Sequence, residues 1–101
     1  MKFGIEAASI YVPQIYLSIK DLAEKRNIEP EKLELGLGLK KMAVLDVHED
    51  TATIAANALL QLFKDYNLNP SEIGRIYLGT ESALDGAKPT ATYAVQLVEN
   101  V

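Results

Sequence analysis

The chain has 101 residues, of which 49% are hydrophobic and 24% are charged, and its formal net charge is −4. This composition is typical of a soluble globular chain of at most one domain, which buries roughly two-thirds of the surface that it exposes when unfolded. The acidic balance and the absence of any Lys/Arg run argue against a nucleic-acid or membrane-surface partner, because both need a basic face. With no cysteine, the chain has no disulfide framework, thiolate nucleophile or thiolate metal site.

The N-terminal residues lack the features of a targeting segment. A single Lys2 precedes an alternating stretch that Glu6 and Pro13 interrupt, so the uninterrupted apolar region of a signal peptide is missing. No segment is long enough to span a bilayer. We therefore expect a cytoplasmic protein in a reducing compartment.

The first part of the chain predicts a strand followed by a helix. Phe3 to Val12 is rich in β-branched and aromatic side chains and stops at Pro13, which favours a strand and then a break. Ser18 and Asp21 resemble a capping pair, and the helix that they begin runs to about Arg26. Its apolar stripe is Ile19, Leu22 and Ala23.

The middle of the chain predicts a helical turn and then the longest helix. Pro30 is a favourable first helical residue, and Gly36 and Gly38 end the turn. From about Asp50 to Tyr66 apolar residues recur with the helical period, and Asp50 or Thr51 caps the start. The apolar stripe of this helix is Ile54, Ala55, Ala58, Leu59, Leu62 and Phe63.

The last part predicts a second strand and a final helix. Asn67 to Pro70 breaks the long helix, a short turn follows at Ser71 to Ile73, and Arg75 to Gly79 has the composition of a strand. The final helix is expected from about Pro89 to Glu99. Its apolar stripe is Tyr93, Ala94, Leu97 and Val98.

Together these elements form an α/β pattern whose two strands are expected to be parallel. Two strands are too few for a stable parallel sheet, which is covered on both faces and usually has about four strands or more. We therefore expect either a piece of a larger α/β protein or a chain that completes its sheet by pairing with another chain.

Glu81, in the stretch "GTES", directly follows an apolar run that ends at Leu78. Ligands of parallel α/β sheets bind beyond the carboxyl ends of the strands, where Glu81 is expected to lie. The residue is either a solvated loop glutamate or a partly desolvated carboxyl group that works as a general acid or base. Position alone does not decide between them, because a fold does not by itself carry a function.

Other candidate residues are weaker. Gly36-Leu37-Gly38 has no third glycine and no preceding strand, so it fails as a dinucleotide fingerprint. His48, in the acidic stretch "DVHED", could indicate a metal site or a catalytic base, but a histidine at a helix entrance is more often simply exposed. We expect no metal site. Asp85 and Lys88 either line a pocket beside Glu81 or form a solvated turn.

Three stretches carry a resemblance to a known enzyme family. They are "EPEKLELGLG" from Glu29, "MAVLDVHEDTATIAANA" from Met42 and "GTESALDGAK" from Gly79, and the opening "GIEAASIYVPQIYLSIKDLAEKRNIEPEKL" adds to them. Together they resemble the N-terminal part of 3-hydroxy-3-methylglutaryl-CoA synthase, in the right order and over nearly the whole chain. The resemblance implies a thiolase-like fold, a layered αβαβα architecture, with residues 1–101 as an incomplete N-terminal segment of a protein that is a homodimer at full length.

The resemblance also implies a Claisen-type condensation of two CoA thioesters, acetyl-CoA and acetoacetyl-CoA, without a further cofactor. In the family a cysteine takes the acetyl group, the thioester loses a proton, and the resulting carbon nucleophile attacks acetoacetyl-CoA before hydrolysis frees the product. The glutamate of the family's "GTES" or "GTET" segment is the acid/base of the condensation, and this role carries over onto Glu81. Thr80 and Ser82 match the motif and are expected to shape the turn.

The resemblance further implies a CoA-binding segment at Glu29, Pro30 and Lys32. The ammonium group of Lys32 can meet a phosphate as a point charge. By composition alone, Lys32 would be an ordinary solvated lysine beside acidic neighbours.

The family's nucleophilic cysteine and catalytic histidine have no counterpart among these residues, so the resemblance implies a chain that is inactive alone. Two classes of function stay open: part of an acyltransferase, or a non-catalytic CoA-binding or pairing module of a thiolase-like assembly. Mevalonate synthesis, ketone-body formation and the β-branching of polyketides all use relatives with this pattern. A mevalonate role is the default expectation.

Overall fold

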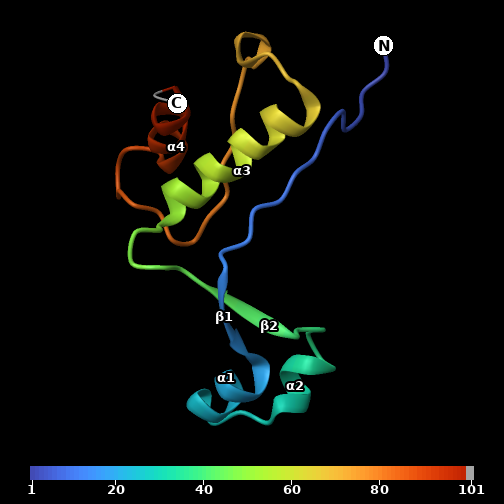
Figure 1. Ribbon diagram of the computed structural model, residues 1–101, viewed down its shortest axis with the longest axis vertical. Helices are drawn as coiled ribbons and strands as arrows, with labels where there is room; N and C mark the ends of the chain where they lie inside the picture. The colour runs from blue at the N-terminus through green and yellow to red at the C-terminus, as the bar shows by residue number, and fades with distance from the viewer. Residues whose placement is uncertain (100–101) are drawn as a thin grey trace. The chain divides into compact units, whose positions relative to one another are not determined.

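The computed structural model describes residues 1–99. In chain order its elements are β1 (Ile15–Ser18), α1 (Ile19–Arg26), α2 (Pro30–Glu34), β2 (Lys41–Val44), α3 (Thr51–Tyr66), the 3-10 helix η1 (Pro70–Glu72) and α4 (Thr90–Glu99) (Figure 1). The chain divides into two compact units. Residues 12–48 form the hairpin unit, and residues 1–11 with those from Glu49 onward form the helical unit.

In the hairpin unit, β1 and β2 pair antiparallel, with Ile15 opposite Val44 and Ser18 opposite Lys41. The ammonium of Lys41 lies 4.1 Å from the centre of the Tyr16 ring, a diagonal cation–π contact across the strands. Neither β1 nor β2 is among the predicted strands, and β2 is only four residues long and begins with a lysine. The predicted parallel pair is therefore wrong: the only strand pair among residues 1–99 is antiparallel and joins other segments.

Helix α1 follows β1 directly and begins as predicted. The Ser18 hydroxyl oxygen accepts a hydrogen bond of 3.1 Å from the backbone N–H of Asp21, which satisfies one of the unpaired donors of the first turn. The helix ends at Asn27 in the left-handed region (φ 54°), a conformation that asparagine tolerates better than most residues. Ile19 and Ala23 of this helix are the buried apolar residues of the hairpin unit.

The longest helix of the helical unit is α3, and it begins where the sequence predicts. The Asp50 carboxylate accepts from the backbone N–H of Thr53 at 2.8 Å, and the Thr53 hydroxyl oxygen accepts from the N–H of Asp50 at 2.7 Å. This reciprocal pair is a capping box. Of the two predicted caps, Asp50 is therefore the actual one, and Thr51 is the first helical residue.

Helices α3 and α4 pack against each other, and their buried side chains are small. Ala52 and Ala56 on α3 and Thr90 and Ala94 on α4 are all buried, and each pair is four residues apart on one helix face. The predicted stripes of both helices are mostly half-buried, and Leu97 is 41% exposed. The most buried residues of α3, Ala52 and Ala56, thus lie on a face that is rotated away from the predicted stripe.

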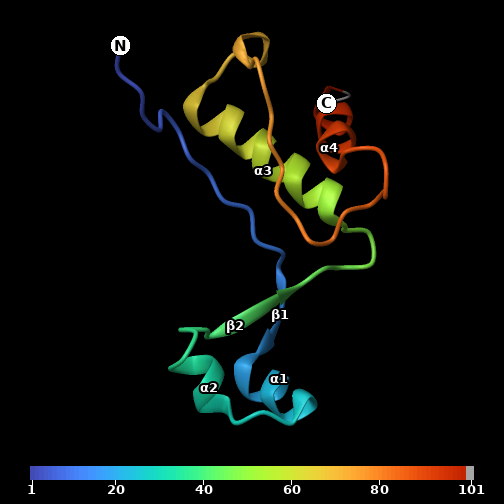
Figure 2. The same cartoon turned by 180° about the vertical axis from the view of Figure 1, so that it is seen from behind.

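The predicted strands at Phe3 to Val12 and Arg75 to Gly79 are wrong as secondary structure, since no residue in the described part of the chain pairs with them. Figures 1 and 2 show residues 73–80 as an extended line across α3 from both sides. Alternating apolar side chains favour an extended backbone, but a strand also needs a hydrogen-bonding partner, which local sequence does not supply. No helix within residues 1–99 is long and apolar enough to cross a membrane.

Candidate active site

Glu81 lies on the loop of residues 79–89, which joins the extended segment before it to α4; we call it the Glu81 loop. Its side chain is exposed and accepts no hydrogen bond from any residue that the structure describes. The hydroxyl oxygen of Thr80 accepts from the backbone N–H of Ser82 at 3.0 Å, so Thr80 shapes the turn as predicted. The Glu81 carboxylate is therefore held on a formed turn with its oxygens free.

Helix α3 holds the loop from one side. The Thr51 hydroxyl donates a hydrogen bond of 2.7 Å to the backbone carbonyl of Ser82, the residue after Glu81. Since Asp50 already caps α3, the Thr51 hydroxyl is not needed at the helix terminus.

Helix α4 holds the loop through Asp85, in the middle of the loop. One carboxylate oxygen of Asp85 accepts from the backbone N–H groups of Ala87 (2.8 Å) and Lys88 (3.2 Å), and the other accepts from the Tyr93 hydroxyl at 3.0 Å. The N–H of Leu84 donates to the hydroxyl oxygen of buried Thr90 at 3.2 Å. Asp85 was expected either to line a pocket or to form a turn. The structure favours the turn, and the Tyr93 hydrogen bond ties that turn to α4.

These hydrogen bonds favour the ionised form of Asp85. The N–H groups of Ala87 and then Lys88, followed by the Tyr93 hydroxyl, hold the pKa of the Asp85 carboxyl below its ordinary value. The same contact raises the pKa of Tyr93 above 10.0, because the hydroxyl proton is held by the carboxylate. The Lys88 ammonium lies 4.2 Å from the centre of the Tyr93 ring, so Lys88 packs on α4.

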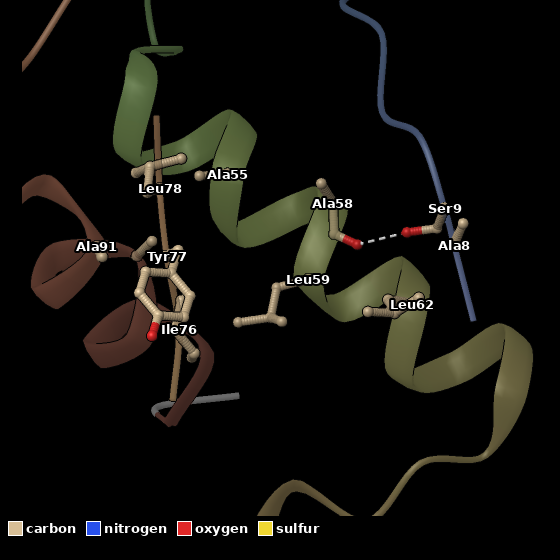
Figure 3. Close-up of a pocket in the computed structure, with 11 residues that line it drawn as sticks. Ala8, Ser9, Ala55, Ala58, Leu59, Leu62, Ile76, Tyr77, Leu78 and Ala91 are labelled. Atoms are coloured by element: carbon tan, nitrogen blue, oxygen red, sulfur yellow. Dashed lines mark hydrogen bonds between the residues drawn. The ribbon is translucent and has the colours of Figure 1, made fainter. Parts of the chain in front are cut away.

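An apolar groove of about 370 Å³ lies beside α3 (Figure 3). Its walls come from the N-terminal segment, α3, the segment before the Glu81 loop and α4, and are Ala8, Ser9, Ala55, Ala58, Leu59, Leu62, Ile76, Tyr77, Leu78, Ala91 and Ala94. The Ser9 hydroxyl donates to the carbonyl of Ala58 at 3.0 Å (Figure 3). A smaller hollow of about 260 Å³ reaches the base of the Glu81 loop at Gly79 and Thr80.

The predicted CoA-binding residues lie in the hairpin unit, whereas Glu81 lies in the helical unit. Glu29 precedes α2 with an extended backbone and makes no side-chain cap, and Pro30 is the first helical residue. Lys32 is exposed on α2, and its backbone N–H donates to the carbonyl of Glu29 at 3.1 Å. The segment therefore forms the short helical turn that the sequence predicts.

The remaining candidates have ordinary structural roles. His48 is 76% exposed, and its Nδ1 atom lies 4.0 Å from the Asp46 carboxylate. Within residues 1–99, no group of three or more His, Cys, Asp or Glu side chains could hold a metal ion. Gly36 lies at the end of α2, where a Cβ atom would come within 2.4 Å of the Lys32 carbonyl oxygen, so its role as a helix stop is structural.

Two hydrogen bonds that hold the Glu81 loop, from Thr51 and Tyr93, were not foreseen from the sequence. Thr51 was a candidate cap, and Tyr93 was assigned to the apolar stripe of the last helix. The sequence does contain a signal for the Tyr93 contact: its phenol hydroxyl comes eight residues after Asp85, the aspartate of the turn. No sequence signal pairs Thr51 with Ser82, because the two are 31 residues apart.

The family model, the relatives and the solved structures that resemble this chain all point to the same family. The family model described as "Hydroxymethylglutaryl-coenzyme A synthase N terminal" matches residues 1–101. Hydroxymethylglutaryl-CoA synthase of Haloferax volcanii is 39% identical over 99 residues, which are 97% of this chain and 22% of the relative. The enzyme of the same name from Methanocaldococcus jannaschii is 34% identical over 96 residues, 95% of this chain and 28% of the relative.

Two solved structures resemble the chain closely. One is MvaS in complex with 3-hydroxy-3-methylglutaryl coenzyme A, with a TM-score of 0.80 and 42% identity over 95% of this chain. The other is an HMG-CoA synthase complexed with CoA, with a TM-score of 0.72 and 30% identity over 98% of this chain. This chain spans 23% and 25% of those two. The similarity confirms the predicted α/β fold class of thiolase-like type.

Proposed function

The chain belongs to the hydroxymethylglutaryl-CoA synthase family, and from this membership we propose that it forms the N-terminal part of a synthase that condenses acetyl-CoA with acetoacetyl-CoA. The product is 3-hydroxy-3-methylglutaryl-CoA, formed through an acetyl-cysteine. In this proposal residues 1–101 supply the acid/base Glu81 and part of the CoA site. Further residues or a second chain complete the sheet, and the synthase is a homodimer in the mevalonate pathway.

One observation carries the proposal: Glu81 presents an exposed carboxylate on a loop that hydrogen bonds from Thr51 and Tyr93 tie to α3 and α4. Removing a proton from the carbon next to a thioester needs a base, and the alkoxide that forms on acetoacetyl-CoA needs an acid. A carboxyl group can serve both needs in turn. A fixed backbone with free carboxylate oxygens meets the geometric demand of such proton transfers.

The CoA part of the proposal rests on α2. An exposed lysine on a short helical turn can pair with a CoA phosphate as a point charge, and Pro30 fixes the start of that turn. The two similar structures contain 3-hydroxy-3-methylglutaryl coenzyme A and CoA, which supports CoA thioesters as the ligand class.

The absence of cysteine limits what these residues do alone. The chain has no thiol to accept the acetyl group, so we expect the isolated chain to form no acetyl-enzyme. Acetyl transfer from acetyl-CoA to a side chain of the isolated chain would contradict this part of the proposal.

The test uses the synthase polypeptide that carries these residues at its N-terminus. Glu81→Gln keeps the shape of the side chain but removes the titrating proton. We expect the variant to acetylate its cysteine normally and to lose condensation, because only the second step needs the carboxyl group. Equal loss of both steps would count against the assigned role.

A further inference from the structure

Hydroxyl groups from two helices hold the Glu81 loop at two points that follow Glu81, at Ser82 and at Asp85. On α3, the Thr51 hydroxyl donates to the carbonyl of Ser82 at 2.7 Å. On α4, the Tyr93 hydroxyl donates to the carboxylate of Asp85 at 3.0 Å. All of these residues belong to the helical unit.

The Thr51 contact is not explained by the stability of α3 alone. The terminus of α3 is already satisfied by the capping box of Asp50 and Thr53, so the Thr51 hydroxyl adds nothing to the helix itself. It instead holds the peptide that joins Ser82 to Ala83, one residue beyond Glu81. Ser82 also donates its N–H to the Thr80 hydroxyl oxygen, so the short turn that contains Glu81 is attached to α3 through Ser82.

The Tyr93 contact acts three residues further along the loop, at Asp85. Asp85 closes its own turn by accepting from the N–H groups of Ala87 and Lys88, so the turn would form without Tyr93. What the Tyr93 hydroxyl adds is the attachment of that turn to α4. The loop is thereby tied to α3 and α4, which pack against each other.

We propose that Thr51 and Tyr93 are positioning residues, which hold the Glu81 loop between α3 and α4 so that the Glu81 carboxylate meets the reacting carbon in a fixed geometry. This inference rests on the proposed function of Glu81. Neither hydroxyl touches substrate in this account. Each acts through the backbone or through Asp85, and the carboxylate of Glu81 stays free for proton transfer.

The test uses variants that remove one hydroxyl each in the full synthase polypeptide. Thr51→Val and Tyr93→Phe keep the shape of the side chain, whereas Thr51→Ser keeps the donor. Thr92→Val is the matched control, because Thr92 is exposed on α4. Acetyl transfer to the cysteine and condensation with acetoacetyl-CoA are measured separately.

We expect Thr51→Val and Tyr93→Phe each to lower the kcat of condensation about 3- to 10-fold, the range that the net free energy of one hydrogen bond gives. Acetyl transfer and the KM for acetoacetyl-CoA stay unchanged, Thr51→Ser restores the condensation rate, and Thr92→Val has no effect. Condensation within twofold of the parent in both variants overturns the inference. Parallel loss of acetyl transfer and condensation also overturns it, because that pattern indicates general destabilisation.

Glu81→Gln, measured beside them, separates this inference from the proposed function. If Glu81→Gln loses condensation while the Thr51 and Tyr93 variants retain it, the positioning role is wrong and the role of Glu81 stands. If Glu81→Gln retains condensation, the proposed role of Glu81 fails and the positioning role falls with it.

Discussion

The Tyr93 hydroxyl donates a hydrogen bond of 3.0 Å to the Asp85 carboxylate, and the pKa values of the two groups are shifted in opposite directions. The pKa of Asp85 is lowered from 3.8. The ionised carboxylate therefore adds to the free energy of unfolding above pH 3.8, and this contribution is lost as the pH falls through the lowered pKa. The pKa of Tyr93 is raised from 10.0. The protonated hydroxyl therefore adds to the free energy of unfolding below pH 10.0, and this contribution is lost as the pH rises through the raised pKa. The attachment of the Glu81 loop to α4 is therefore predicted to hold across the whole neutral range.

Tyr93→Phe tests this contact directly. The substitution removes one of the groups that favour the Asp85 carboxylate, so we expect the pKa of Asp85 to rise. It should stay below the ordinary value, because the N–H groups of Ala87 and Lys88 remain. The measurement is an NMR titration of the Asp85 side-chain carboxyl, with Tyr66→Phe on α3 as the control. An unchanged pKa of Asp85 in Tyr93→Phe would show that the hydroxyl does not reach the carboxylate in solution.

Gly36 is predicted to be essential for the end of α2. A Cβ atom at this position would lie 2.4 Å from the Lys32 carbonyl oxygen, so Gly36→Ala forces backbone to move and should cost about 1–3 kcal/mol of unfolding free energy. Gly4→Ala is the matched control, since a Cβ there meets nothing within 4 Å. Urea unfolding followed by far-UV circular dichroism measures both. Equal stability of the two variants would refute the close approach at Gly36.

Lys32 is predicted to contribute to the binding of CoA thioesters. In the full synthase polypeptide, Lys32→Ala should raise the KM for acetyl-CoA about 3- to 10-fold, the loss expected for one charge-assisted contact to a phosphate, with little change in kcat. Lys25→Ala, which removes an exposed lysine from α1, is the control. The effect should shrink as salt is added, because exposed charge pairs are screened. A KM equal to that of the control variant would remove Lys32 from the CoA site.

The isolated chain is predicted to self-associate. Phe3, Ile5 and Ile10 on the N-terminal segment are 88%, 91% and 80% exposed, and Tyr77 is 83% exposed. Extended segments that expose apolar side chains and unpaired backbone groups tend to pair with other chains. Sedimentation at several concentrations should reveal oligomers, and Ile10→Lys should reduce them. A monomer at every concentration would contradict this prediction.

The helices and their caps could be predicted from the sequence because their determinants are local. Ser18 with Asp21, and Asp50 with Thr53, meet within one helical turn. The strands could not be predicted, because pairing joins residues such as Ile15 and Val44 that are far apart in the chain. The same limit applies to the Glu81 loop: the motif indicates Glu81, but the Thr51 contact comes from tertiary packing.

The central claim is that Glu81 serves the condensation and not the acetylation. The direct test is a single-turnover experiment in which the full synthase polypeptide is first acetylated with labelled acetyl-CoA and then mixed with acetoacetyl-CoA. For Glu81→Gln we predict normal labelling of the cysteine and loss of about 10²-fold or more in condensation, the contribution typical of one general acid or base. Glu72→Gln, which changes an exposed glutamate on η1, should behave as the parent in both steps. Normal condensation by Glu81→Gln, or an equal fall in both steps, would contradict the account.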